Sequence, residues 1–319
     1  MKTIGGEAEL EQSTLHTYFT DSGRSALRLI LRSLNLKLVA LPDYLCSVIT
    51  DVLVQEEIQF VYYKINNDLS IDTTTISDNC DSVYIIDYFG IKHDYLKELP
   101  LVSDKIIIED NVFSPFIENT CGFKRWLSFN SYRKFSVCGE GSLIKSNIEL
   151  DQNLIFSSSA PFSSFKYQAK ATKYEYLIHN LHSEEDYLHQ FERGEESLDQ
   201  QREIFSISPQ GLNQIIKFHE SLVFETKQRD RNYQILKKLI SPISFDVAIF
   251  KSFFVFSCGN IEYVRKELMS HKIFLARHWP NIYKLNTTLY QNLMSIPLDS
   301  RYDENDMERI ANIINKKMS

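Results

Sequence analysis

The stretch Ser131–Ser142, SYRKFSVCGEGS, lies between two short apolar runs in the middle of the 319-residue chain. The runs are Trp126–Phe129 before it and Leu143–Ile144 after it, and both are typical of core strands. Lys134 therefore stands on a short connection between two predicted strands, just ahead of a Gly-Glu-Gly turn. A solvated lysine is the ordinary interpretation, and the surrounding sequence decides whether a chemical role is the better one.

The composition is that of an ordinary globular protein, with 43% hydrophobic and 24% charged residues. The net charge of −7, without a basic tract, argues against nucleic acid or an anionic membrane as a partner. No apolar run approaches the length of a membrane span, and the first residues show no secretion signal. The five widely spaced cysteines form neither a zinc pattern nor a disulfide framework. We therefore expect a cytoplasmic protein without a metal site.

Predicted strands and helices alternate on both sides of the quoted stretch. Helical spacing covers Ser25–Leu36 and Tyr44–Val54. Short runs rich in apolar residues predict strands at Val39–Leu41, Ile58–Ile65, Val83–Ile86 and Ile106–Ile108. Wholly apolar runs suit strands that are buried on both faces, as in a parallel sheet. The alternation predicts an α/β fold with a mostly parallel central sheet.

The second half of the chain has a different pattern. Residues from about 151 to 205 are polar with helical spacing, which predicts a helical excursion. Beyond it we expect helices at Leu212–Leu239, Ile261–Ser270 and about Glu304–Lys317, and strands within Ser244–Cys258, near Ile273 and at Leu293–Pro297. We predict a large α/β domain over residues 1–214, which includes the excursion, and a smaller C-terminal α+β domain over residues 215–319.

Polar residues at the carboxyl ends of parallel strands are candidates for ligand binding. The segment TDSGRSAL opens a helix with a Gly-containing turn, whose free N–H groups favour an anion at Ser22, Gly23, Arg24 and Ser25. The segment KIIIED ends a buried strand with Asp110, and Tyr44 follows another strand, where it is placed to stack on a flat ligand. Taken singly, an ordinary helix cap, a surface acid and a core aromatic are the more common interpretations.

Taken together, these parts fit the cofactor pyridoxal phosphate. Its phosphate would lie at the helix start and its ring against Tyr44, while Asp110 would pair with the pyridinium nitrogen. Lys134 would be the Schiff-base lysine and proton carrier, a role that partial burial favours by lowering the pKa of the amine. In such a site the protein orients and tunes the cofactor, which supplies the chemistry.

The order of these segments resembles the DegT/DnrJ/EryC1/StrS family of sugar aminotransferases, in the fold-type-I group of pyridoxal phosphate enzymes. SYRKF followed by GEG is similar to the lysine segment of that family. The likeness extends over most of the chain, through IGGEAELE at Ile4–Glu11, SGRSAL at Ser22–Leu27, LPDYLCSVI at Leu41–Ile49, NDLSID at Asn67–Asp72, DYFG at Asp87–Gly90, IIIED at Ile106–Asp110, HWP at His278–Pro280 and IPLDSRYDENDMERI at Ile296–Ile310.

The resemblance implies a homodimeric enzyme that transfers an amino group, commonly from glutamate, to a keto-sugar carried on a nucleotide. The products of such enzymes enter lipopolysaccharide, capsule or antibiotic sugars.

The resemblance also places the Schiff-base role on Lys134. For the phosphate we expect Ser131 rather than Ser128, because its S-x-R-K grouping is similar to the form in that family. We expect Arg133 to contact phosphate or substrate, with a surface salt bridge as the alternative, and His278 to face substrate, with packing against Trp279 as the alternative. Many members carry Gln or His near the phenolic oxygen of the cofactor, where this chain has Phe113.

Two further functions stay open from the sequence. One is a pyridoxal-phosphate-binding degenerate or regulatory protein without transaminase activity. Phe113 favours it, as does the lack of a recognisable Asn-Tyr-Arg segment near Phe205–Gln214. The other is a pyridoxal-phosphate-dependent sugar dehydratase, and Lys134 speaks against it because related dehydratases are expected to carry histidine there.

Overall fold

The computed structural model describes residues 14–92, 104–119, 122–241, 250–259, 261–279, 285 and 287–318. The segment IGGEAELE and the first part of the predicted strand region Ser244–Cys258 lie outside the described residues. Among the described residues, no helix is both long and apolar enough to cross a membrane.

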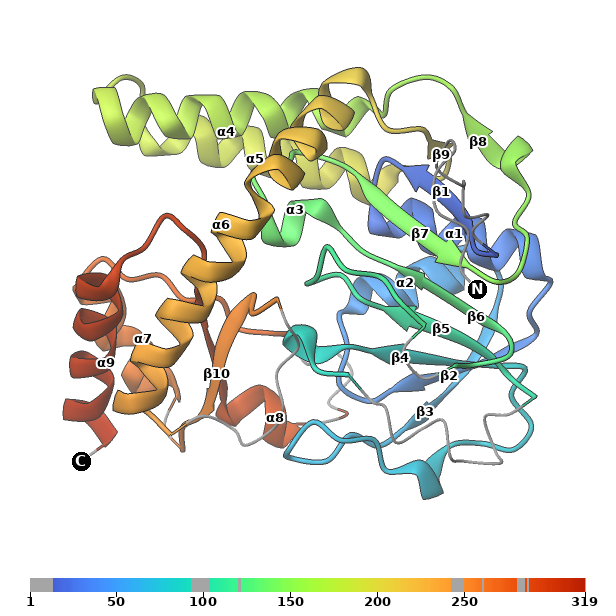
Figure 1. Ribbon diagram of the computed structural model, residues 1–319, viewed down its shortest axis with the longest axis horizontal. Helices are drawn as coiled ribbons and strands as arrows, with labels where there is room; N and C mark the ends of the chain where they lie inside the picture. The colour runs from blue at the N-terminus through green and yellow to red at the C-terminus, as the bar shows by residue number, and fades with distance from the viewer. Residues whose placement is uncertain are drawn as a thin grey trace, which may run out of the picture.

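Within the described residues, seven strands form the central sheet, in the order β1-β7-β6-β5-β4-β2-β3 (Figure 1). They are β1 His16–Thr20, β2 Leu38–Pro42, β3 Gln59–Tyr63, β4 Ser82–Ile86, β5 Ile106–Asp110, β6 Trp126–Phe129 and β7 Ser142–Ser146. β7 runs antiparallel to β1 and β6, and the other pairings of this sheet are parallel. The predicted mostly parallel sheet is confirmed. Its inner strands β4, β5 and β6 are buried along their whole length, as their apolar sequences require.

Helices follow the first strands as the periodicity predicts. α1, Gly23–Leu34, begins after the cap Ser22, whose hydroxyl accepts from the Ser25 N–H. α2, Ser47–Gln55, begins three residues later than predicted from Tyr44. The chain bends at Asp43 and Tyr44 instead, and the Asp43 N–H donates to the Tyr63 carbonyl at 2.8 Å. The short helices η1, α3, η2 and η5 occupy Thr73–Thr75, Tyr132–Phe135, Tyr88–Gly90 and Gln152–Leu154.

The predicted helical excursion is a pair of packed helices, α4 Pro161–His179 and α5 Glu184–Gln200. A two-stranded parallel pair, β8 Ile155–Phe156 and β9 Ile204–Phe205, closes its base. Figure 1 shows the α4–α5 pair projecting beyond the sheet at the upper left. The Phe205 N–H donates to the side chain of Asp21 at 3.1 Å, which ties the base of the excursion to the start of α1.

A second apolar core lies in the C-terminal part of the chain. It includes buried side chains of β10 Phe253–Ser257, β11 Leu293–Pro297, α7 Ile261–Ser270 and α9 Glu304–Met318, while α8 Thr287–Asn292 lies before β11. β10 and β11 pair antiparallel. The long α6, Pro209–Leu239, descends from the α4–α5 pair to α7 and α9 (Figure 1). The boundary between 214 and 215 stays a prediction, and α6 is continuous across it.

The predicted strand near Ile273 is wrong. The described residues that follow α7 form a turn and an irregular segment. The Ile273 N–H donates to the Leu268 carbonyl at 2.9 Å, and Lys272 has the left-handed φ of 59°. The backbone of Ile273 is therefore used to end α7, while its side chain packs against the second core.

Candidate functional site

The turn that carries Lys134 is held from both sides by backbone hydrogen bonds. The Tyr132 N–H donates to the Gly141 carbonyl at 3.0 Å, and the Gly141 N–H donates to the Asp21 carbonyl at 2.6 Å. Gly141 has a φ of +105°, a backbone conformation that residues other than glycine rarely adopt. Asn130 is buried and donates to the Ser114 carbonyl while it accepts from the Leu143 N–H. The lysine turn is thus fixed to α1, to β7 and to the loop after β5.

Lys134 itself differs from the rest of its turn. Tyr132 and Phe135 point into a third apolar cluster, whereas the Lys134 side chain is exposed. The protein around it still lowers the pKa of its amine by desolvation, and the charge of Arg133 lowers it further. The Lys134 amine is therefore accessible to a ligand, and its lowered pKa favours the neutral form that can react with one.

Asp110 ends β5 inside the protein. The Tyr84 hydroxyl donates to its Oδ2 at 2.5 Å, and the Val112 N–H donates to its Oδ1 at 3.2 Å. Burial raises the pKa of Asp110 to about 6, although the hydrogen bonds from Tyr84 and Val112 and the charge of Lys134 oppose the rise. Among the described residues no cation forms an ion pair with this carboxylate, so a buried acceptor is left for a cationic ligand group.

The start of α1 lies against the lysine turn. A Cβ atom on Gly23 would lie 3.6 Å from the Cβ of Ser131 and 3.7 Å from the Asn130 carbonyl oxygen. Ser22 and Ser25 are buried beside each other, with 3.3 Å between their hydroxyl oxygens. The structure therefore brings the predicted phosphate-binding residues of α1 next to Ser131.

The side chains of Arg24 and Arg133 turn toward α5. Arg24 pairs with Asp199 and lies 3.6 Å from Glu195, and the Arg133 Nη2 atom lies 3.3 Å from the same Glu195. Lys166 of α4 completes the group, with its Nζ atom 2.5 Å from Glu195. Burial opposes ionisation of Glu195, but the charges of Arg133 and Lys166 and the hydrogen bond from Lys166 lower its pKa to about 2.

Tyr44, Phe113 and His278 meet in an aromatic cluster. The Tyr44 ring stacks on Tyr88 at 5.6 Å, and its hydroxyl donates to the His278 carbonyl at 2.5 Å. Phe113 lies edge-to-face with His278 at 6.0 Å. Tyr44 is buried among these rings, so its stacking on a ligand stays a prediction.

His278 links this cluster to the Lys134 side of the site. Its Nε2 atom lies 2.9 Å from the Ser295 hydroxyl oxygen. Burial and the charge of Lys134 lower the pKa of His278 to about 4, so its imidazole is neutral near pH 7. A neutral ring near Lys134 is a group that can accept or donate a hydrogen bond without adding charge.

Sequence reasoning missed Glu140 although it stands in the quoted stretch. Its buried carboxylate accepts from the hydroxyls of Ser163 in the first turn of α4 and Ser208 at the cap of α6. The Ser208 N–H also reaches it at 3.4 Å. A carboxylate at two helix starts complements both helix dipoles. Glu140 therefore joins the lysine turn to α4 and α6, and its place between two glycines was the available signal.

Tyr84 and Cys46 were also missed. Tyr84 lies on β4 and reaches Asp110 only because the two parallel strands are neighbours, which no local pattern reveals. Burial raises the pKa of the Cys46 thiol, which lies within range of the charges of Lys134, Arg24 and Asp110. In the part of the chain that the structure describes, no cluster of His, Cys, Asp or Glu is arranged to hold a metal ion.

Solved structures of other proteins share this architecture. A DegT/DnrJ/EryC1/StrS aminotransferase from Brucella abortus matches with a TM-score of 0.64 at 14% identity, over 95% of this chain and 86% of that chain. A Streptococcus pneumoniae protein in its PLP form matches with a TM-score of 0.62 at 13% identity, over 95% and 88%. DesI, solved in the presence of its TDP-sugar product, matches with a TM-score of 0.66 at 12% identity, over 94% and 80%. No protein-family model and no curated protein sequence matches the chain.

The likeness covers 94 to 95% of this chain. At these identities the similarity establishes the fold rather than the activity. The predicted fold class is confirmed, since the chain has the fold-type-I architecture that the DegT/DnrJ/EryC1/StrS aminotransferases share.

Proposed function

We propose that this chain is a pyridoxal-phosphate-dependent aminotransferase that acts on a keto-sugar carried on a nucleotide. The observation that carries the proposal is that Asp110, at the end of β5, lies within range of the charge of Lys134 without forming an ion pair with it. Asp110 is a buried carboxylate with a raised pKa and no cation partner among the described residues, and Lys134 is an amine with a lowered pKa. The protonated ring nitrogen of the cofactor would supply the missing cation.

The residues of the site also fit the other parts of the cofactor. Pyridoxal phosphate, when bound, supplies an aldehyde for a lysine amine and a ring that withdraws electrons from the substrate. The α1 start with Ser22, Gly23 and Ser25, together with Ser131, would hold the phosphate. The similarity to a protein in its PLP form supports this assignment.

Each side chain then has a separate task. Asp110 keeps a proton on the ring nitrogen, because a carboxylate close to a cation favours its charged form. Lys134 Nζ takes a proton from the substrate carbon and returns it, and its lowered pKa increases the neutral fraction that can do so. Arg133 and His278 are proposed to contact substrate.

The sugar assignment rests on similarity together with the charge of the site. DesI was solved with a TDP-sugar product, and the cationic groups beside Lys134 suit an acceptor that carries phosphate. We further propose glutamate as the amino donor and cell-surface polysaccharide or lipopolysaccharide synthesis in the cytoplasm as the setting.

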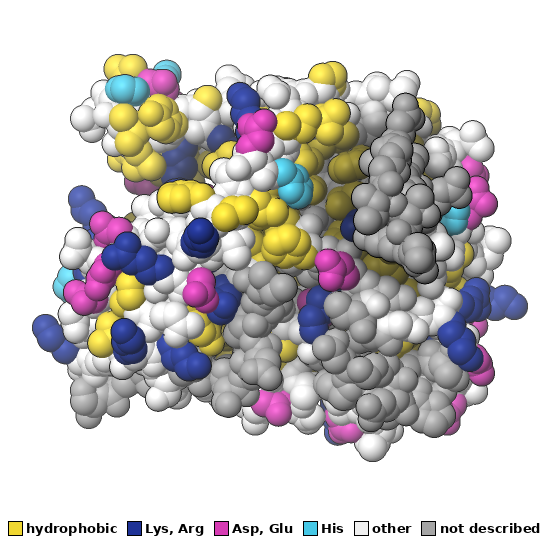
Figure 2. All heavy atoms as spheres, in the orientation of Figure 1, with side chains coloured by type: hydrophobic (Ala, Val, Ile, Leu, Met, Phe, Trp, Pro, Cys, Tyr) yellow, Lys and Arg dark blue, Asp and Glu magenta, His cyan; other side chains and the backbone are white. Residues whose placement is uncertain are grey.

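A homodimer is the proposed assembly. One face of α6 exposes Leu212, Ile216 and Val223, which follow the spacing of a single helix face, and Phe224 lies beside them. Figure 2 shows hydrophobic side chains gathered over this upper part of the molecule. An exposed apolar face of this kind favours association with a second copy. Analytical ultracentrifugation should give twice the mass of one chain, and a monomer at micromolar concentration would contradict the proposal.

The deciding experiment is covalent trapping of the cofactor. Purified protein mixed with pyridoxal phosphate should turn yellow, and borohydride should fix the cofactor to the peptide that contains Lys134, as read by mass spectrometry. Lys134→Ala should lose the trapped adduct completely, whereas Lys105→Ala, at the other edge of the sheet, should keep it. Trapping on another lysine would refute the assignment. A trapped cofactor that glutamate and other amino donors fail to bleach would instead favour the non-catalytic alternative.

A further inference from the structure

One buried arginine of α6 contacts the lysine turn. Arg229 is 3% exposed and lies in the second half of the helix, which passes beside α3 on its way to α7 and α9 (Figure 1). Its Nη2 atom donates to the Phe135 carbonyl oxygen at 2.8 Å. Because Phe135 directly follows Lys134, the guanidinium holds a backbone group that is one residue away from the lysine.

The Phe135 carbonyl is an end group of α3. This helix is a single turn, so its last carbonyls need partners from outside the helix. The Tyr132 carbonyl accepts from the Ser136 N–H at 3.0 Å and from the Ser136 hydroxyl at 2.6 Å, whereas the Phe135 carbonyl accepts from Arg229. Arginine side chains can satisfy such carbonyls. Arg229 therefore caps the lysine turn from 94 residues further along the chain.

The same guanidinium also reaches the segment just ahead of β10. Its Nη1 atom donates to the Ser252 carbonyl at 3.4 Å, and its Cζ atom lies 4.6 Å from the centre of the buried Phe250 ring. Lys251, between these two residues, forms an ion pair of 2.7 Å with Asp230 of α6. Three consecutive residues of this segment are therefore bound to α6 at one place.

Ser252 extends this contact to the carboxyl end of β5. Its hydroxyl donates to the Phe113 carbonyl, and both residues are buried. Phe113 lies in the loop after β5, three residues beyond Asp110. Arg229 and Ser252 together therefore connect the turn that carries Lys134, the loop that follows Asp110 and the segment that enters β10.

Arg229 directs its hydrogen bonds to backbone carbonyls rather than to an acid. Its Nε atom lies 3.6 Å from Glu225 Oε2, and neither atom has a hydrogen-bond partner among the described residues. The other carboxylate oxygen of Glu225 accepts from the Ser300 hydroxyl. A guanidinium is planar, and its N–H groups have fixed directions. The two carbonyls that Arg229 holds are therefore kept in a fixed relation to each other.

We propose that Arg229 is a positioning residue for Lys134, because its guanidinium fixes the lysine turn relative to α6, β10 and the loop after Asp110. The inference rests on the proposed function, since the position of the Lys134 amine matters for catalysis only if that amine reacts. Arg229 acts through the backbone of the turn. A displacement of about 1 Å in a reacting group can slow a reaction by about 10².

Hydrogen–deuterium exchange of the cofactor-free protein tests the hold on the turn without any reaction. Arg229→Lys keeps the charge but not the paired N–H groups of the guanidinium. Exchange in peptides that cover Ser131–Ser142 should become about tenfold faster, as expected for the loss of about one hydrogen bond.

Asn232→Ala is the matched control for this measurement. Asn232 is buried on the same helix and donates to the Leu298 and Tyr302 carbonyls at 3.1 and 3.0 Å. The variant loses buried hydrogen bonds to the C-terminal part without touching the lysine turn. Exchange within Ser131–Ser142 should therefore stay as in the wild type.

Bleaching of the cofactor-loaded variants by glutamate tests the effect on the reaction. Arg229→Lys should still trap the cofactor on Lys134 but should bleach about 10- to 100-fold more slowly at saturating glutamate. The glutamate concentration that gives half the maximal rate should not change, because Arg229 acts on the turn rather than on the amino donor. Arg229→Met, which leaves both carbonyls without this donor, should be slower still. Asn232→Ala should bleach at the wild-type rate.

The outcomes separate this inference from the proposed function. Equal exchange within Ser131–Ser142 in wild type and Arg229→Lys would overturn the inference. Equal slowing of bleaching in Arg229→Lys and Asn232→Ala would overturn it too, because lost stability would then explain both. A wild-type protein that traps pyridoxal phosphate on Lys134 keeps the aminotransferase proposal in either case. If the wild type fails to trap the cofactor, the aminotransferase proposal falls, and the exchange measurement alone decides whether Arg229 fixes the turn.

Discussion

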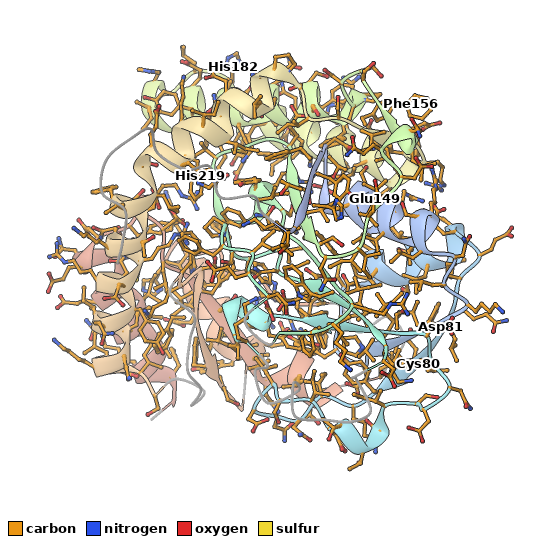
Figure 3. The ribbon with its side chains drawn as sticks, turned by 45° about the vertical axis from the view of Figure 1, so that its right-hand side comes forward. Cys80, Asp81, Glu149, Phe156, His182 and His219 are labelled. Atoms are coloured by element: carbon orange, nitrogen blue, oxygen red, sulfur yellow. The ribbon has the colours of Figure 1, made fainter. Side chains whose placement is uncertain are left out.

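The two edges of the central sheet hold their charged side chains in opposite ways. Where β5 ends, Asp110 is buried and close to Lys134. Where β5 begins, Asp104 and Asp81 are exposed beside an open hollow of about 580 Å³. Figure 3 shows Asp81 at the edge of the sheet away from His219, which hydrogen-bonds Tyr132 of the lysine turn.

The difference teaches that a hollow does not by itself mark a site. The groups at the open edge already have partners within the fold, as Asp81 accepts from the Lys37 and Leu38 N–H groups and Lys105 donates to two carbonyls. At the other edge, Asp110 keeps an ionisable group in a desolvated place without a counter-ion among the described residues. Desolvated, incompletely paired ionisable groups are expected where a ligand completes the set.

The largest expected effect is on the rate at which glutamate bleaches the bound cofactor, when the acid at either end of β5 is neutralised. Asp110→Asn should slow the bleaching of the bound cofactor by glutamate by roughly 10² to 10³, since a fixed charge that stabilises the reacting ring is lost. Asp104→Asn removes the same charge from the start of the same strand and should leave the rate unchanged. Stopped-flow absorbance of the two cofactor-loaded variants measures both rates. Equal rates in the two variants would show that the charge of Asp110 has no special role in the reaction.

The Asp110→Asn variant should be slower than Asp104→Asn in the bleaching assay but should have the higher free energy of unfolding. Because the pKa of Asp110 is raised from 3.8 to about 6, the folded state holds its proton more tightly than the unfolded state does. Ionised Asp110 therefore weakens the cofactor-free fold at pH 8, and this penalty disappears as the pH falls through 6 toward 4. Asp110→Asn should raise the free energy of unfolding by about 2 to 3 kcal/mol at pH 8.

Urea unfolding of the cofactor-free proteins from pH 4 to pH 8 measures this difference. Asp87 and Glu109, whose pKa values burial raises to about 6 and 7, titrate in both wild type and variant. Because the charge of Asp110 also raises the pKa of Asp87, the difference reports Asp110 together with its effect on Asp87. Asp104→Asn should show no such pH-dependent gain. A gain for Asp110→Asn that stayed constant from pH 4 to pH 8 would argue against a raised pKa at that carboxylate.

Much of the fold followed from local pattern. The apolar runs of β4, β5 and β6 predicted a parallel sheet because strands buried on both faces need apolar residues at successive positions. The spacing that predicted a helix at Ile261–Ser270 matches α7. The strand expected near Ile273 failed because a short apolar run does not reveal that its N–H group ends a helix.

The site was predictable only as far as strand ends and helix starts reveal it. Lys134, Asp110 and the start of α1 stood at such positions, and the structure brings them to one edge of the sheet. The groups that surround them come from neighbours in space, such as Glu195 on α5, which binds Arg133 from 62 residues away. Such contacts depend on packing between elements, which a periodic pattern does not encode.

The smallest expected effect tests whether the Tyr84 hydroxyl lowers the pKa of Asp110. Tyr84→Phe removes the hydroxyl that donates to Asp110 Oδ2 and keeps the ring that packs near Phe129. A hydrogen bond to the ionised carboxylate favours that form, so its loss should raise the pKa of Asp110 by about one unit. Cofactor affinity should then fall about fivefold at pH 6 and about twofold at pH 7, and the loss should vanish as the pH rises toward 9 and Asp110 ionises again.

Absorbance titration with pyridoxal phosphate between pH 6 and pH 9 gives the affinity at each pH. Tyr63→Phe is the matched control, because the Tyr63 hydroxyl donates to the Tyr84 carbonyl at 2.8 Å from the neighbouring core and does not reach Asp110. Both variants lose one buried hydroxyl, so both should lose similar stability. Only Tyr84→Phe should change the pH profile, and parallel profiles in the two variants would mean that Tyr84 supports the fold without adjusting the carboxylate.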